Sequence, residues 1–340
     1  MFGILRTILA INVVLLHIFS VPTLGNYSVS FFFVLSGFLM TYIMHETYGF
    51  DLKGLKFFWL NRALRLYPIY LIIISITFLF IYVYAEVKVS DHPHLFSPKS
   101  LSEWIANITM VYPKILPHKF TPRLSPASWA ITNELFFYLL ISLGASKTKL
   151  RTMMWLLFSI GYFVATYLFY DIASYRYGAI PAASLPFSLG ACLYWINKKY
   201  QFKIGVLQII LLYIAFNLNA IYSNSFTPLY KEVSIYINYV LAGLIVYALF
   251  GLKPHKQLQK IDVYLGNYSY PIYLAHYLVA IIYSFAIGIG VKKFGFKLSI
   301  DVITPYFVLL FIFSALLIHL IDKKVNTYKK NLKIKVKNKS

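Results

Sequence analysis

The chain has 340 residues, of which 59% are hydrophobic and 13% are charged, whereas an average soluble domain is about half apolar and a quarter charged. This composition excludes an ordinary soluble enzyme, and the 30 Tyr and 29 Phe residues exclude an unfolded chain. The 32 basic and 11 acidic residues give a net charge of +21. The single cysteine, Cys192, excludes an intramolecular disulfide and a cysteine-rich metal site. We therefore expect an integral membrane protein that holds no metal.

Apolar segments bounded by charges predict an all-α, polytopic membrane helix bundle of about ten transmembrane helices, because one span takes about 20 apolar residues. The predicted spans are 4–21, 28–44, 67–85, 127–143, 153–170, 177–196, 204–222, 233–252, 270–290 and 302–321. The first segment has no small-residue cleavage site after Val21, so it is expected to be a retained helix and not a signal peptide. The expected organisation is a membrane domain at 1–322 and a Lys-rich cytoplasmic tail at 323–340.

The basic residues predict the orientation, because short cytoplasmic loops collect lysine and arginine. With the N-terminus inside, 22 of the 32 basic residues fall in inner segments and 10 fall outside, five of them in one long outer loop at 86–126. Both termini are then cytoplasmic. The tail is expected to be a topological anchor or to touch anionic membrane lipid. Nucleic-acid binding is not expected, because the cations are spread over six inner segments.

Ionisable side chains at membrane depth are costly and mark candidate functional sites. Glu134 is the one acidic residue well inside a predicted span, and the histidines there are His17, His276 and His319. His319 is expected to reach the interface from the inner end of the last span. At 1.5 Å per residue, His17 lies about 20 Å above the inner surface and Glu134 about 10 Å below the outer surface. These similar depths would let the two meet if their helices are neighbours.

The spacing of Arg6 and His17 indicates an elongated ligand. They are eleven positions apart, so both project from one face of the first span, about 16 Å apart along its axis. Coenzyme A has this shape, with phosphates for Arg6 and a thioester for His17. Arg62 and Arg65, three apart on one helical face, would complete a phosphate clamp. Taken singly, each arginine is explained more simply as an inner-face anchor.

Five segments, taken in order, resemble the acyltransferase-3 family of integral membrane acyltransferases, which modify cell-surface glycans and other acceptors. The first is an arginine, ten residues and a histidine, formed by Arg6 and His17. The others are FFFVLSGFLM at 31–40, FFWLNRALRLYP at 57–68, SWAITNELFFY at 128–138 and GNYSYPIYLAH at 266–276. Ten spans is also the number that the family implies. Ala130 stands where the family commonly has a hydroxyl residue, so no catalytic role is expected there.

The resemblance implies transfer of an acyl group, acetyl from cytoplasmic acetyl-CoA, to a hydroxyl of a cell-surface glycan or its lipid-linked precursor. His17 is expected to act as general base or to carry the acyl group itself, and the sequence does not separate these. Glu134 would orient its imidazole. Arg6, Arg62 and Arg65 would bind the donor.

Two further residues are assigned to substrate binding with competing structural explanations. His276 would line the donor channel, or it is a buried histidine bonded to a neighbouring helix. Ser36 would contact substrate, although small residues at 36 and 37 are better explained by close helix packing. No recognisable motif marks spans five to eight, where acceptor specificity is expected to vary.

Two other classes of protein would also place ionisable residues at depth. A polytopic transporter or flippase often has paired spans broken by Gly or Pro, and no such pairing is evident. A polymerase of lipid-linked glycans would need larger outer loops than 86–126 alone. The sequence leaves open the acceptor, the acyl length and the oligomeric state. It fits a bacterial inner membrane, and without an appended esterase-like domain, transfer is expected at the membrane domain itself.

Overall fold

The structure is a computed structural model that describes residues 1–84, 95, 97–112, 124–169, 173–200, 204–288, 296 and 299–329. Over these residues it is helical, with no β-strand, so the predicted all-α membrane bundle is confirmed. Much of the predicted outer loop, and the predicted tail from residue 330 onward, lie outside the described residues.

Thirteen α-helices are defined in the described part of the chain. They are α1 (Gly3–Phe19), α2 (Leu24–Ile43), α3 (Leu52–Val83), α4 (Leu101–Thr109), α5 (Trp129–Ser142), α6 (Lys149–Phe169), α7 (Ala173–Tyr177), α8 (Ser184–Lys199), α9 (Val206–Tyr222), α10 (Pro228–Gly251), α11 (Lys256–Gly266), α12 (Ser269–Ala286) and α13 (Ile300–Leu317). Short π-helices follow α2 (Met44–Tyr48) and α13 (Ile318–Asp322), and 3₁₀ turns precede α5 (Pro126–Ser128) and α8 (Ile180–Ala183).

Each of the ten predicted spans coincides with a helix, but the helices differ in length. By length and composition, six helical segments of the described chain are long and apolar enough to cross a membrane, and α1 and α9 are shorter apolar helices. One of the six, Lys256–Ala286, consists of two helices, α11 and α12. Helix α5 has only 14 residues, which is about 21 Å of helix. It is therefore shorter than the hydrocarbon core is thick.

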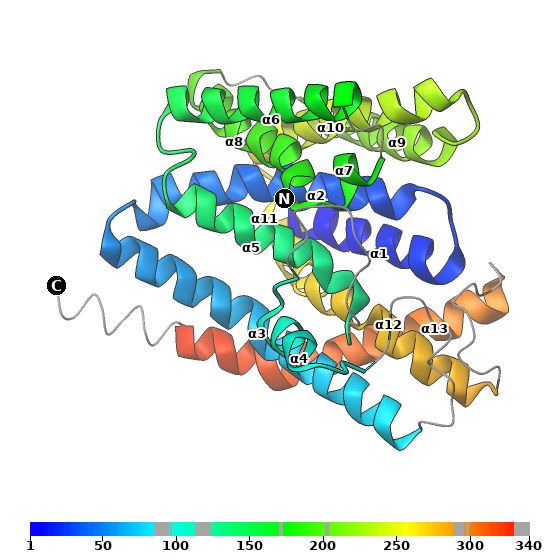
Figure 1. Cartoon of the computed structure of the whole chain (residues 1–340). Helices are drawn as coiled ribbons and strands as arrows, with labels where there is room; N and C mark the ends of the chain where they lie inside the picture. Colours follow the sequence, from blue (N-terminus) through cyan, green and yellow to red (C-terminus); the bar gives the residue numbers. More distant parts are fainter. Residues whose placement is uncertain are drawn as a thin grey trace.

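The α1–α2 hairpin is the centre of the bundle. Figure 1 shows α1 and α2 between an upper group (α6, α8, α9 and α10) and a lower group (α3, α12 and α13). Buried side chains of α1 and α2 belong to both of the two hydrophobic clusters, one shared with α3, α5, α12 and α13 and the other with α8, α9 and α10. We call the end of the bundle where α1 begins the near end, and the opposite end, at the turn Ser20–Thr23, the far end.

The outer surface of the bundle is apolar, which is the reverse of a soluble protein. On α6, Leu157, Phe158 and Leu168 are 66%, 74% and 70% exposed, and Leu207 of α9 is 67% exposed. Contiguous apolar exposure of this kind needs a nonpolar solvent. The bilayer therefore covers these helices.

Helices α2 and α8 cross in close contact at two glycines. A Cβ added at Gly37 would lie 2.1 Å from the carbonyl oxygen of Phe187, and one added at Gly190 would lie 2.0 Å from the carbonyl oxygen of Val34. Small residues allow such backbone approach in membrane helices. The packing role favoured at position 37 is therefore what the structure shows, and the crossing holds α2 in place beside the site described below.

We expect Gly190→Ala to destabilise the protein by about 1–3 kcal/mol, because the added methyl must push two backbones apart. The measurement is thermal unfolding of the purified protein in detergent. Gly161→Ala in α6 is the control, because a Cβ there meets nothing within 4 Å and alanine favours helix. Equal unfolding temperatures for Gly190→Ala and the wild type would contradict the close crossing.

Helix α11, which the hydropathy pattern did not predict, fastens the start of α1. The Asp262 carboxylate accepts a hydrogen bond from the Ile4 amide (2.9 Å), and the Thr7 hydroxyl donates to the Leu265 carbonyl (2.6 Å). A Cβ at Gly3 would lie 1.8 Å from the Asp262 carbonyl oxygen. Figure 1 shows α11 behind the beginning of α1, running across the bundle. These contacts fix the first turn of α1, which carries Arg6.

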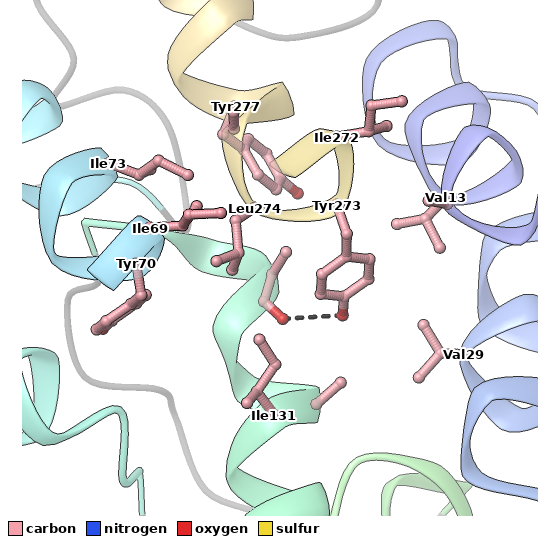
Figure 2. Close-up of a cluster of buried hydrophobic side chains, with 14 of the residues drawn as sticks. Val13, Val29, Ile69, Tyr70, Ile73, Ile131, Ile272, Tyr273, Leu274 and Tyr277 are labelled. Carbon is pink, nitrogen blue, oxygen red and sulfur yellow. Dashed lines mark hydrogen bonds between the residues drawn. The ribbon is translucent and has the colours of Figure 1, made fainter. Parts of the chain in front are cut away.

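The chain enters α5 deep inside the bundle and not at its far end. The Tyr273 hydroxyl donates to the Ala127 carbonyl (2.9 Å), and the Ser125 hydroxyl donates to the Leu274 carbonyl (3.3 Å). Figure 2 shows Tyr273 pointing from α12 toward the start of α5, with this hydrogen bond drawn. Since α12 begins at Ser269, four or five residues place the start of α5 about 6–8 Å from the near end of α12.

Candidate functional site

One pocket toward the near end is lined by five of the residues that the sequence analysis predicted as site residues. They are Arg6, Ser36, Arg62, Arg65 and Glu134. The pocket holds about 110 Å³ and is enclosed by α1, α2, α3, α5 and α12. Its polar lining residues are Arg6, Ser36, Arg62, Arg65, Glu134, Tyr138, Ser269, Tyr270 and Tyr273. Arg6 comes from α1, and Arg62 and Arg65 come from α3, so the fold brings together cations that lie up to 59 positions apart in the chain. We call this cavity the arginine pocket.

The three guanidinium groups of the arginine pocket form no ion pair with a carboxylate of the described chain, although Glu134 lines the same pocket. Among the described residues, no Asp or Glu oxygen lies within the 4.0 Å ion-pair distance of Arg6, Arg62 or Arg65, whereas Arg176 pairs with Glu232 at 3.1 Å. The Nε of Arg62 is buried and has no hydrogen-bond partner. Buried donors are normally satisfied, so cations arranged in this way suit an anionic ligand. Guanidinium groups bind phosphates in a bidentate manner.

Two contacts hold the walls of the arginine pocket. The Ser269 hydroxyl donates to the Arg6 carbonyl (3.0 Å), and the Tyr270 hydroxyl donates to the Leu66 carbonyl (2.8 Å). The first ties α12 to α1 and the second ties α12 to α3. Both arginine-bearing helices are therefore fixed to the first turn of α12.

Glu134 belongs to the arginine pocket and does not bond to His17 as expected. Its two carboxylate oxygens accept hydrogen bonds from the Ser36 hydroxyl (2.9 Å) and the Tyr138 hydroxyl (2.7 Å). Ser36 thus contributes a polar contact at a position where the sequence favoured packing. The hydrogen bond expected between Glu134 and the His17 imidazole is therefore not formed in this structure.

The depth of α5 explains why Glu134 and His17 do not meet. The depth expected from the sequence assumes that α5 begins at the far surface. The structure instead places Ala127 beside Tyr273 inside the bundle. Seven residues further along α5, Glu134 lies about 10 Å closer to the near end. It therefore reaches the arginines, and His17 in the last turn of α1 stays deeper.

His17 pairs with His276 across the interface between α1 and α12. The distance from His17 Nδ1 to His276 Nε2 is 3.0 Å, and the two rings stack with centroids 5.2 Å apart. His276 is completely buried, and His17 is half-buried. The Tyr277 ring packs against both imidazoles, with its centroid 5.3 Å from that of His17 and 4.5 Å from that of His276. We call the two residues the histidine pair.

The histidine pair lies one helical turn along α12 from a residue that lines the arginine pocket. Tyr273 lines the pocket, and its carbonyl oxygen lies 2.8 Å from Nδ1 of His276. Three residues of helix span about 4.5 Å. Neither His17 nor His276 lines the arginine pocket itself.

Two tyrosines of the site were missed as functional residues, although both lie within motifs that the sequence brought forward. Tyr138 is four residues after Glu134, the helical spacing at which side chains meet, and it donates to that carboxylate. Tyr273 precedes His276 by three residues and contacts it through the backbone. The helical spacing from each ionisable residue is the signal that would have found them.

A scan against protein families matches residues 2–321 to the model of an acyltransferase domain, Acyl_transf_3. The chain belongs to the acyltransferase-3 family. It is therefore a membrane acyltransferase, and the resemblance drawn from the five motifs is confirmed. No curated protein and no solved structure matches the sequence. Within the described residues of this acyltransferase, no three His, Cys, Asp or Glu side chains gather to hold a metal ion.

Proposed function

We propose that the protein transfers an acetyl group from cytoplasmic acetyl-CoA to a hydroxyl of a cell-surface glycan or of its lipid-linked precursor. The observation that carries the proposal is the arginine pocket, where Arg6, Arg62 and Arg65 converge without forming an ion pair with a described carboxylate. Tyr273 of α12 lines this pocket, and His276 of the histidine pair follows it by one helical turn. An acyl donor with phosphates at one end and a thioester at the other matches this order of groups. The small volume of the pocket suits the diphosphate or the slender arm of such a donor.

At the histidine pair, we assign the proton transfer to His17. As general base, its imidazole takes the proton of the acceptor hydroxyl while the hydroxyl oxygen forms a bond to the thioester carbonyl carbon. The carbon–sulfur bond then breaks, and the coenzyme A thiolate leaves and takes up the proton. In the alternative, His17 itself attacks the thioester and holds the acetyl group. Rapid quenching followed by protein mass measurement distinguishes the two, because only the second gives a His17-linked acetyl group.

The near end of the bundle is assigned to the cytoplasm of a bacterial cell, with the protein in its inner membrane. Support comes from the basic residues, of which 22 lie on the side of Arg6 in the expected topology. Acetyl-CoA is cytoplasmic, so the donor would enter at the arginine pocket. The glycan hydroxyl would reach the histidine pair from the far end.

The experiment that tests this function is label transfer in membranes. Membranes containing the protein, and membranes without it, are incubated with acetyl-CoA labelled in the acetyl group and with surface glycan or lipid-linked glycan. We expect acid-stable, alkali-labile label in the glycan only when the protein is present, and NMR then identifies the esterified hydroxyl. Equal label in both membranes, across both acceptor classes, would contradict the proposed function.

Glu134→Gln is expected to change donor affinity and to leave turnover within about threefold of the wild type. Glutamine still accepts a hydrogen bond from Ser36 or Tyr138, but it removes the negative charge from a pocket that binds an anion. Donor affinity should therefore stay equal or increase. The measurement is kcat and donor KM in the label-transfer assay. A large loss of kcat at unchanged KM would instead indicate that Glu134 acts with His17 in the catalytic step.

A further inference from the structure

The hydrogen bonds of the histidine pair determine which nitrogen carries each proton. The Tyr273 carbonyl oxygen is only an acceptor, so Nδ1 of His276, at 2.8 Å, must donate to it. A neutral imidazole carries one proton, so Nε2 of His276 holds the lone pair. His17 Nδ1, at 3.0 Å from that nitrogen, must then be the donor. In a neutral His17, the lone pair is then on Nε2.

Burial and packing keep His276 neutral and fixed. Its side chain is completely buried, and a charge there would be costly without a carboxylate. Its ring packs against Tyr277, and the Tyr306 hydroxyl donates to its backbone carbonyl (2.9 Å). The ring is therefore held by both its neighbours and its backbone. A fixed second group of this kind commonly sets the tautomer of a functional histidine.

We propose that His276 is a positioning residue that holds His17 in the tautomer with a basic Nε2 and stabilises the imidazolium that forms on His17. This inference rests on the proposed function. When the acceptor hydroxyl gives its proton to Nε2 of His17, the Nδ1–H of His17 remains bonded to His276. That bond then becomes charge-assisted and stronger. His276 itself gains and loses no proton, and an attack by Nε2 on the thioester would use the same lone pair.

Two amide substitutions at position 276 separate this role from a structural one. His276→Gln supplies a side-chain oxygen as far from the backbone as Nε2 of histidine, so it still accepts the hydrogen bond from His17. His276→Asn reaches only the Nδ1 position, where it bonds to the Tyr273 carbonyl and leaves His17 without its acceptor. The two variants differ by one methylene and have the same polar groups. Retained folding is checked by thermal unfolding, and an intact arginine pocket by the Kd of acetyl-CoA.

We expect His276→Gln to keep kcat within about tenfold of the wild type and His276→Asn to lose at least about 100-fold, both with unchanged acetyl-CoA Kd. Equal kcat for the two variants, or a loss confined to KM, would overturn the inference. The wild type and His17→Ala are assayed alongside. Absence of transfer by the wild type would contradict the proposed function, whereas transfer by the wild type with undiminished His276→Asn would overturn the role of His276 alone.

The tautomer is also measured directly in the wild type, without any substitution at position 276. In protein labelled with ¹⁵N-histidine, the His17 resonances are assigned by their loss in His17→Ala. We expect the His17 Nδ1 to be protonated and Nε2 to be unprotonated at neutral pH. The opposite assignment would overturn the inference, whatever the variants show.

Discussion

His17→Ala is expected to lower acetyl transfer by about 10²- to 10⁴-fold, the range over which a general base contributes to catalysis. Removing the imidazole removes the Nε2 that we propose as the base. The three arginines are not altered, so the Kd of acetyl-CoA should stay within about twofold of the wild type. The measurements are label transfer to glycan and equilibrium binding of acetyl-CoA to the purified protein.

His319→Ala is the matched control for His17→Ala. His319 lies in the π-helix after α13, is exposed, and lies 2.9 Å from the Lys323 ammonium group. Its removal should leave transfer unchanged, as expected for a residue at the interface. If both His17→Ala and His319→Ala kept the full rate of transfer, His17 would have no part in the reaction.

Arg62→Gln is expected to weaken acetyl-CoA binding by about 10- to 100-fold. Hydrogen bonds to charged groups contribute about 1.5–3 kcal/mol, and 1.4 kcal/mol corresponds to a tenfold change in Kd. The buried, unpartnered Nε of Arg62 indicates that its donors are arranged for a ligand and not for the protein. The double variant with Arg65→Gln should weaken binding further, while kcat at saturating donor falls much less.

Lys56→Gln is the control for the arginine substitutions. Lys56 lies on the same helix, six residues before Arg62, and is exposed outside the pocket. The substitution removes one positive charge from the near end without removing a hydrogen-bond donor of the pocket. The acetyl-CoA Kd of this variant should therefore change less than twofold at physiological salt. If Lys56→Gln weakened binding as much as Arg62→Gln, general surface charge and not the pocket would hold the donor.

The sequence predicted where the membrane helices lie, because a segment that crosses the bilayer must be apolar and is bounded by charged residues. All ten expected spans coincide with helices. Helix α11 was missed because its lysines and glutamines make 256–266 typical of a loop, and only its packing against α1 shows its role. The short capped helix α4 was missed too, although Ser100 and Glu103 form a capping box that is visible in the sequence.

The candidate site was predictable where one helix carries the information. Arg62 and Arg65 lie on one helix and reach one pocket, as their spacing indicated. The partner of His17 was not predictable, because it depends on the relative depth of helices that are far apart in sequence. Counting residues from the far surface placed Glu134 beside His17, whereas the segment before α5 folds into the bundle and displaces Glu134 by several ångströms.

The most direct test of the account is an experimental structure of the protein with a non-hydrolysable acetyl-CoA analogue. The account predicts that the phosphates of the analogue contact Arg62 and Arg65, and that its acyl carbonyl lies within about 4 Å of Nε2 of His17. An analogue bound with its phosphates away from the arginine pocket, or with its acyl end directed away from the histidine pair, would contradict it.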